Sequence, residues 1–175
     1  MNYLDDSIDF NDKRVVDAYD ELPLWSAPFG LMLLDRIPMK PELSVLDVGC
    51  GTGFPLLELA GRLGPSSRLV GIDTWSAALE RARAKATSYG LENVRIVEGD
   101  AARMAFDDGS FDLVTSNLGI NNFEDPDAVL RQCFQHRSDD VAIDLFQSFY
   151  LGVGPALVGR FVGGFDMDAN QVVIM

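Results

Sequence analysis

The sequence has few of the residues that build metal sites and hydrolytic triads. Its 175 residues include two cysteines, Cys50 and Cys133, and a single histidine, His136. The cysteines do not have metal-ligand spacing, and one histidine cannot supply both a metal site and a Ser/His/Asp triad. We therefore expect no bound metal, and we expect His136 to face solvent at the end of a helix.

Basic residues are also scarce, with 14 Lys and Arg against 27 Asp and Glu and a formal net charge of -13. A surface of this charge repels phosphate backbones, and no cluster of Lys and Arg opposes it, so nucleic acid is not an expected partner. The longest uncharged run, residues 145–159, is too short to span a bilayer and is interrupted by Pro155. The first ten residues lack the basic start and apolar run of a secretory signal. These absences predict no membrane span and a cytoplasmic location.

Apolar runs rich in Val, Ile and Leu alternate with helical patterns through most of the chain. Strands are expected at residues 44–49, 68–73, 93–100 and 111–118, and helices at 55–63, 76–89 and 127–135. Ser76 is expected to cap the second helix and Gly90 to end it, while Asp125 followed by Pro126 begins the third. This order predicts an α/β fold: a doubly wound, mostly parallel sheet with helices on both faces.

The two ends of the chain are less regular. Residues 1–42 are expected to form a helical segment or lid, with two short helices separated near Pro23 and Pro28, and residues 43–175 to form the ligand-binding domain. After Gln135 we expect a fifth strand within residues 139–146 and a closing strand at residues 171–175. The segment between them carries many glycines and is the least regular part of the chain.

Polar residues stand where the expected strands end. Asp47 and a glycine loop, residues 49–53, follow the first strand, and Asp73, Asp100 and Asn117 end the next three. In an open parallel sheet the ligand lies beyond the carboxyl ends of the strands. The sequence therefore predicts one ligand site that these residues share.

The glycine loop does not have the spacing of a phosphate-binding loop. A nicotinamide fingerprint would need a further glycine at Phe54 or Leu56, and a Walker loop would need a Lys that this segment lacks. A carboxylate at Asp73 can accept both hydroxyls of a ribose, and Asp100 can accept from an adenine amine. Because Asp47 adds negative charge beside the loop, a cationic adenosine fits better than a pyrophosphate.

With these motifs in place, the sequence resembles the class I S-adenosylmethionine-dependent methyltransferases. The resemblance rests on "VLDVGCGTG", "LVGID", "EGDA" and "FDLVTSNLGINNF", and it is strongest to the small-molecule branch that includes ubiquinone and menaquinone methyltransferase-like domains. It implies a Rossmann-like methyltransferase fold with S-adenosyl-L-methionine as cofactor. Because residues 136–146 replace the turn that this family has after the fourth helix, and few residues follow, it also implies an atypical or truncated C-terminal end. It also implies cofactor-binding roles for Asp47, Gly49, Cys50, Gly51, Asp73, Thr74, Trp75, Asp100, Ala101 and Asn117.

The methyl acceptor is expected to be a small molecule, and neither a catalytic base nor an oligomeric state is assigned. Tyr19, Trp25, Asn121 and Asn122 are candidate acceptor-site residues, although two aromatics can equally be core and two asparagines can be turn residues. Asp73 and Asp100 could also be helix caps. Two other functions stay open: a cofactor-binding protein without turnover, and a nicotinamide oxidoreductase that the glycine spacing disfavours.

Overall fold

Helices and strands alternate along the chain, as the sequence predicts. The computed structural model describes residues 9–21, 26–37, 39–138, 143–145 and 172–174. The helices are α1 (Lys13–Glu21), α2 (Ala27–Arg36), α3 (Leu56–Leu63), α4 (Ser76–Ser88) and α5 (Pro126–His136), with the short 3-10 helices η1 (Ala101–Arg103) and η2 (Gly119–Asn122). The strands are β1 (Ser44–Val48), β2 (Arg68–Asp73), β3 (Val94–Glu98), β4 (Leu113–Ser116), β5 (Ile143–Leu145) and β6 (Val172–Ile174).

The six strands form one sheet in the order β3-β2-β1-β4-β6-β5. Each pair of neighbours is parallel, so their carboxyl ends lie at one edge of the sheet. In the register, Asp47 on β1 lies between Gly71 on β2 and Thr115 on β4. The expected fifth and closing strands are present, and the closing strand β6 lies between β4 and β5.

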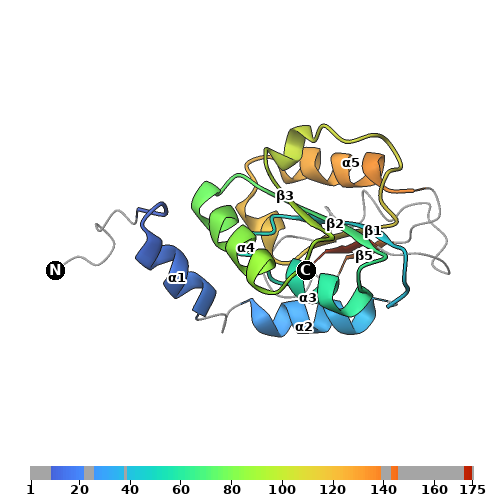
Figure 1. Cartoon of the computed structure of the whole chain (residues 1–175). Coiled ribbons are helices and arrows are strands. Elements are labelled where there is room, and N and C mark those ends of the chain that lie inside the picture. Colours follow the sequence, from blue (N-terminus) through green and yellow to red (C-terminus); the bar gives the residue numbers. More distant parts are fainter. Residues whose placement is uncertain (1–8, 22–25, 38, 139–142, 146–171, 175) are drawn as a thin grey trace.

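Helices cover both faces of the sheet, as Figure 1 shows for α5 on one side and α2 and α3 on the other. Alternate strand residues separate into two apolar cores. One core joins Val45, Leu69 and Leu113 to residues of α2, α3 and α4. The other joins Leu46, Val70 and Val114 to α5 and η1. The doubly wound α/β prediction is therefore confirmed, and α1 lies apart from these layers, beside α4 (Figure 1).

The ends of the helices agree with the sequence in two of three places. The Asp125 side chain accepts from the N–H of Ala128 at the start of α5, and Gly90, with φ of 66°, follows the last turn of α4. The prediction for Ser76 is wrong, because α4 has no side-chain cap and the Ser76 hydroxyl donates to Glu98 on the adjacent strand, at 2.6 Å.

The prediction that His136 faces solvent is also wrong. Its side chain is only 2% exposed, with its ring against Phe106 and its two nitrogens 3.3 Å from the Asp107 carbonyl oxygen and from Gln132 Oε1. The last turn of α5 lies under the segment that precedes β4, and this long-range packing covers the ring. Within the described residues, no helix is long and apolar enough to cross a membrane.

Gly71 provides a direct test of the packing between β2 and α3. A Cβ built there would lie 2.5 Å from Leu56 Cδ2 and 2.7 Å from Cys50 Sγ. We expect Gly71→Ala to lower the free energy of unfolding by about 1–3 kcal/mol, as overpacking does. Gly61→Ala, on the exposed side of α3 with nothing within 4 Å of its Cβ, is the matched control. It should raise the same quantity by about 0.5–1 kcal/mol. Chemical denaturation of both variants measures this, and equal effects would contradict the packing described.

Candidate cofactor-binding site

The sequence-predicted residues meet at the carboxyl edge of the sheet. Asp47 belongs to β1, Asp73 is the last residue of β2, and Asp100 and Asn117 follow β3 and β4 closely. Since β3, β2, β1 and β4 are consecutive neighbours in the sheet, the structure brings the four ends together in the expected order.

The glycine loop after β1 turns through three residues with positive φ: Gly49 at 75°, Gly51 at 49° and Gly53 at 100°. The N–H groups of Gly49 and Cys50 both donate to the Ile72 carbonyl oxygen, at 2.8 and 3.2 Å. These two donors are therefore committed to the neighbouring strand. Any contact of Gly49 or Cys50 with a ligand would have to use other backbone atoms.

Gly119, which sequence reasoning missed, lets the loops after β1 and β4 approach each other closely. A Cβ on Gly119 would lie 2.7 Å from Ser116 Oγ and 3.0 Å from the Val48 carbonyl oxygen, and a Cβ on Gly49 would lie 3.1 Å from Gly119 Cα. Only residues without side chains fit at this approach. The signal was present in the sequence as a glycine three residues after the fourth strand, but the close contact depends on the fold.

Asp73 connects the glycine loop to the start of α4. Its Oδ2 accepts from the Gly51 N–H and its Oδ1 from the Trp75 N–H, each at 2.9 Å. The side chain is half-buried, and each carboxylate oxygen has a second lone pair. The carboxylate is thus held in one place by the backbone and can still accept further donors there.

Asp47 is the most deeply buried acid, with 1% of its surface exposed. Its Oδ1 accepts from the Thr115 hydroxyl at 2.8 Å, and its Oδ2 has no partner among the described residues. Burial raises the pKa of Asp47 to about 7, the hydrogen bond from Thr115 opposes this, and the charge of Asp73 adds to it. Near neutral pH this carboxyl therefore does not carry the full negative charge that its sequence position suggests.

Asp100 and Asn117 have partners within the protein. The exposed Asp100 accepts from the Ala102 N–H at 2.9 Å and caps η1, with Ala101 buried behind it. Asn117 Nδ2 donates to the Ser26 carbonyl oxygen at 3.3 Å, while its Oδ1 is buried with no partner in the described part of the chain. The cap explains the position of Asp100, and the vacant Oδ1 leaves Asn117 with an unused acceptor.

Of the candidate acceptor residues, Tyr19 contacts Trp75, a residue predicted to bind the cofactor. Their ring centroids lie 5.2 Å apart, and Phe10 lies on Trp75 at 5.7 Å. Partial burial and the charge of Asp73 raise the pKa of Tyr19. Thr74 is exposed beside them. Among the remaining candidates, Asn121 and Asn122 belong to η2 with Asn122 exposed, and Trp25 lies outside the described residues.

No group of three or more His, Cys, Asp or Glu that could hold a metal ion occurs in the ranges that the structure describes. Both cysteines are buried as free thiols. Burial raises the pKa of Cys50 well above its ordinary value and that of Cys133 to about 12, so neither thiol is activated as a nucleophile.

Residues 39–143 match the methyltransferase domain family, and the chain belongs to this family. It is 32% identical over 129 residues to a demethylmenaquinone methyltransferase of Lactococcus lactis, which covers 74% of this chain and 50% of the relative. It is 40% identical over 117 residues to a nocamycin O-methyltransferase of Saccharothrix syringae, covering 66% of this chain and 42% of that one. The chain therefore spans about half the length of these curated relatives.

The crystal structure of a SAM dependent methyltransferase from Aquifex aeolicus has the same fold, with a TM-score of 0.62 at 22% identity over 75% of this chain and 69% of that chain. The family resemblance and the Rossmann-like methyltransferase fold that the sequence predicts are thus confirmed.

The buried Asp47 makes stability depend on pH. Its folded pKa of about 7 lies above the ordinary value of 3.8, so between these values the folded protein keeps a proton that the unfolded chain has released. The free energy of unfolding should therefore fall as pH rises from 4 to 7. Asp47→Asn keeps an acceptor for Thr115 and removes this dependence. Relative to the parent at the same pH, the free energy of unfolding of Asp47→Asn should therefore be higher at pH 7 than at pH 4.5, by roughly 1–4 kcal/mol.

Urea denaturation at both pH values measures that difference, and the exposed Asp35→Asn on α2 is the control. The control should shift the free energy of unfolding by nearly the same small amount at both pH values. Parallel pH profiles for Asp47→Asn and the parent would contradict the burial of an ionisable Asp47.

Proposed function

We propose that this protein transfers the methyl group of S-adenosyl-L-methionine to a small-molecule acceptor. The observation that carries the proposal is the Asp73 carboxylate, which two backbone N–H groups hold at the end of β2 beside the glycine loop. Family membership supports methyl transfer as the reaction class.

The residues at the sheet edge fit this cofactor. Asp73 would accept the two ribose hydroxyls, because a fixed carboxylate with vacant lone pairs matches two adjacent O–H donors. Asp100 and Ala101, at the start of η1, would lie against the adenine. The buried Asp47 Oδ2 and Asn117 Oδ1 are acceptors without donors, which suits the ammonium of the methionine part. When bound, the cofactor supplies an activated methyl group on a sulfonium.

The residues of the chain then have to orient the cofactor and the acceptor and to exclude water from the site. The glycine loop, fixed to Ile72 and Asp73, would position the methionine part, and the half-buried Trp75 would border the ribose. Because the leaving group is already activated, positioning the acceptor in line with the methyl supplies most of the required rate. No residue is assigned as a general base.

The acceptor is proposed as a small molecule from the chemistry of the relatives, whose names specify a demethylmenaquinone and nocamycin. Tyr19, Asn121 and Asn122 remain candidates for its binding. Incubation of the protein with isotopically labelled S-adenosylmethionine and a metabolite extract, followed by mass spectrometry, should reveal a product that gains one labelled methyl group. Cofactor binding without any labelled product would contradict turnover.

Asp73→Ala tests the cofactor site directly. It removes the ribose acceptor together with the anchor of the Gly51 and Trp75 N–H groups, so affinity for S-adenosylhomocysteine should fall roughly 10- to 150-fold. Asp73→Asn should fall between this variant and the parent, because the amide keeps one acceptor oxygen. Asn117→Ala should cost less than Asp73→Ala, because a neutral amide makes weaker bonds than a carboxylate.

Titration calorimetry on variants that circular dichroism shows to be folded gives these affinities. A folded Asp73→Ala protein that binds S-adenosylhomocysteine as tightly as the parent would contradict the ribose assignment. Stabilisation of the parent by NAD and not by S-adenosylhomocysteine would contradict the proposed cofactor.

A further inference from the structure

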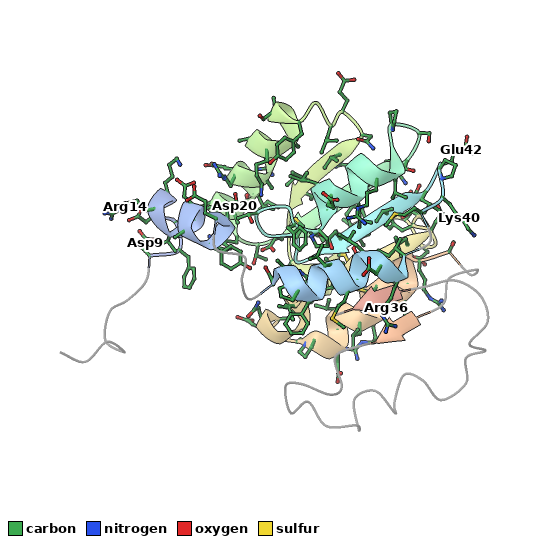
Figure 2. The ribbon with its side chains drawn as sticks, turned by 90° about the horizontal axis from the view of Figure 1, so that it is seen from below. Asp9, Arg14, Asp20, Arg36, Lys40 and Glu42 are labelled. Carbon is green, nitrogen blue, oxygen red and sulfur yellow. The ribbon has the colours of Figure 1, made fainter. Side chains whose placement is uncertain are left out.

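α1 is joined to the domain by an acidic side chain that neither the fold nor the proposed reaction explains. Asp20 is nearly buried, with 10% of its side chain exposed, and its two carboxylate oxygens meet Arg81 Nε at 2.8 Å and Lys85 Nζ at 2.5 Å, both on α4. In Figure 2, Asp20 lies at the end of α1 nearer the domain, whereas Asp9 and Arg14 lie at the outer end.

The glycine loop lies near the same carboxylate. The buried Thr52, in the middle of that loop, is one of the residues whose side chains lower the pKa of Asp20. Burial raises the pKa of Asp20, but the hydrogen bonds from Lys85, Arg81 and Thr52 outweigh this and keep the pKa below its ordinary value. A single ionised group on α1 therefore joins this helix to α4, close to the glycine loop.

A second contact joins the N-terminal part to Trp75, which lies two residues after Asp73. The Trp75 indole N–H donates to the Phe10 carbonyl oxygen at 2.7 Å, and the rings of Phe10 and Tyr19 both lie edge-on to Trp75. Trp75 is itself fixed by its backbone N–H to Asp73. Residues 10–20 are thus joined through Trp75 to the end of β2, and Asp20 lies near Thr52 of the glycine loop. These are the two elements that would hold the nucleoside.

We propose that α1 is a strap over the nucleoside part of the cofactor, and that Asp20 is the positioning residue that latches it to Arg81 and Lys85. The proposal rests on the proposed function, since it needs a nucleoside beside Asp73. A bound cofactor leaves only when the Asp20 contacts open, so the strap sets the dissociation rate. When a smaller fraction of the protein is latched, the apparent affinity for the cofactor falls in proportion to that fraction.

The test compares Asp20→Asn with Glu21→Gln, an adjacent exposed residue on α1 whose substitution removes the same charge. Asp20→Asn should speed the dissociation of S-adenosylhomocysteine by about tenfold, as expected when hydrogen bonds between charged groups are lost, and Glu21→Gln by less than about twofold. In ligand-free protein, amide hydrogen exchange of residues 13–21 should be faster in Asp20→Asn alone. Added salt should speed dissociation more for the parent than for Asp20→Asn, because the ion pairs are partly exposed.

Faster exchange in α1 with an unchanged dissociation rate would overturn the strap, because α1 would then be latched without covering the cofactor. An unchanged exchange rate would overturn the latch. If Asp20→Asn lowers the melting temperature and changes neither rate, the role of Asp20 is purely structural and the proposal is overturned. Should Asp20→Asn fail to fold, the Arg81→Gln/Lys85→Gln double variant breaks the same ion pairs from α4. Failure of the parent to bind S-adenosylhomocysteine would instead contradict the proposed function.

Discussion

The hydrogen bonds from the Gly51 and Trp75 N–H groups to the Asp73 carboxylate are the interaction on which the site depends. They join three segments that come from different parts of the chain: the glycine loop after β1, the end of β2 and the first turn of α4. Without that carboxylate, two backbone donors would lose their partner at the edge of the sheet. The same group is the best candidate for a ligand contact, so one side chain both organises the site and offers it to a nucleoside.

A second constraint is the burial of polar groups behind this edge. Asp47, Thr115 and Ser116 are each at most 2% exposed, and two of their oxygens, Asp47 Oδ2 and Ser116 Oγ, have no partner among the described residues. Buried polar atoms without hydrogen-bond partners destabilise a folded protein, and they are found at sites that bind ligands. The raised pKa of Asp47 follows from the same burial. A cationic ligand nearby would favour its ionised form, which couples cofactor charge to this carboxyl.

The sequence predicted the elements well where a signal is local. The strands, the Asp125 cap and the end of α4 at Gly90 depend on patterns within a few residues, and each is present. The prediction also succeeded in grouping Asp47, Asp73, Asp100 and Asn117, because parallel strands must bring their ends to one edge. It failed where distant contacts decide. Ser76 bonds to Glu98 rather than capping its helix, and packing against Phe106 buries His136. Likewise, only the fold reveals that the Gly49 and Cys50 N–H groups donate to Ile72 and that Asp20 pairs with Arg81 and Lys85.

We propose that the carboxyl edge of β1, β2, β3 and β4 forms a single nucleoside site organised by Asp73. A crystal structure of the protein soaked or grown with S-adenosylhomocysteine tests it most directly. We expect the two ribose hydroxyls to lie within hydrogen-bonding distance of the Asp73 carboxylate, with the adenine beside Asp100 and Ala101. A ligand bound elsewhere, or one whose ribose makes no contact with Asp73, would contradict it.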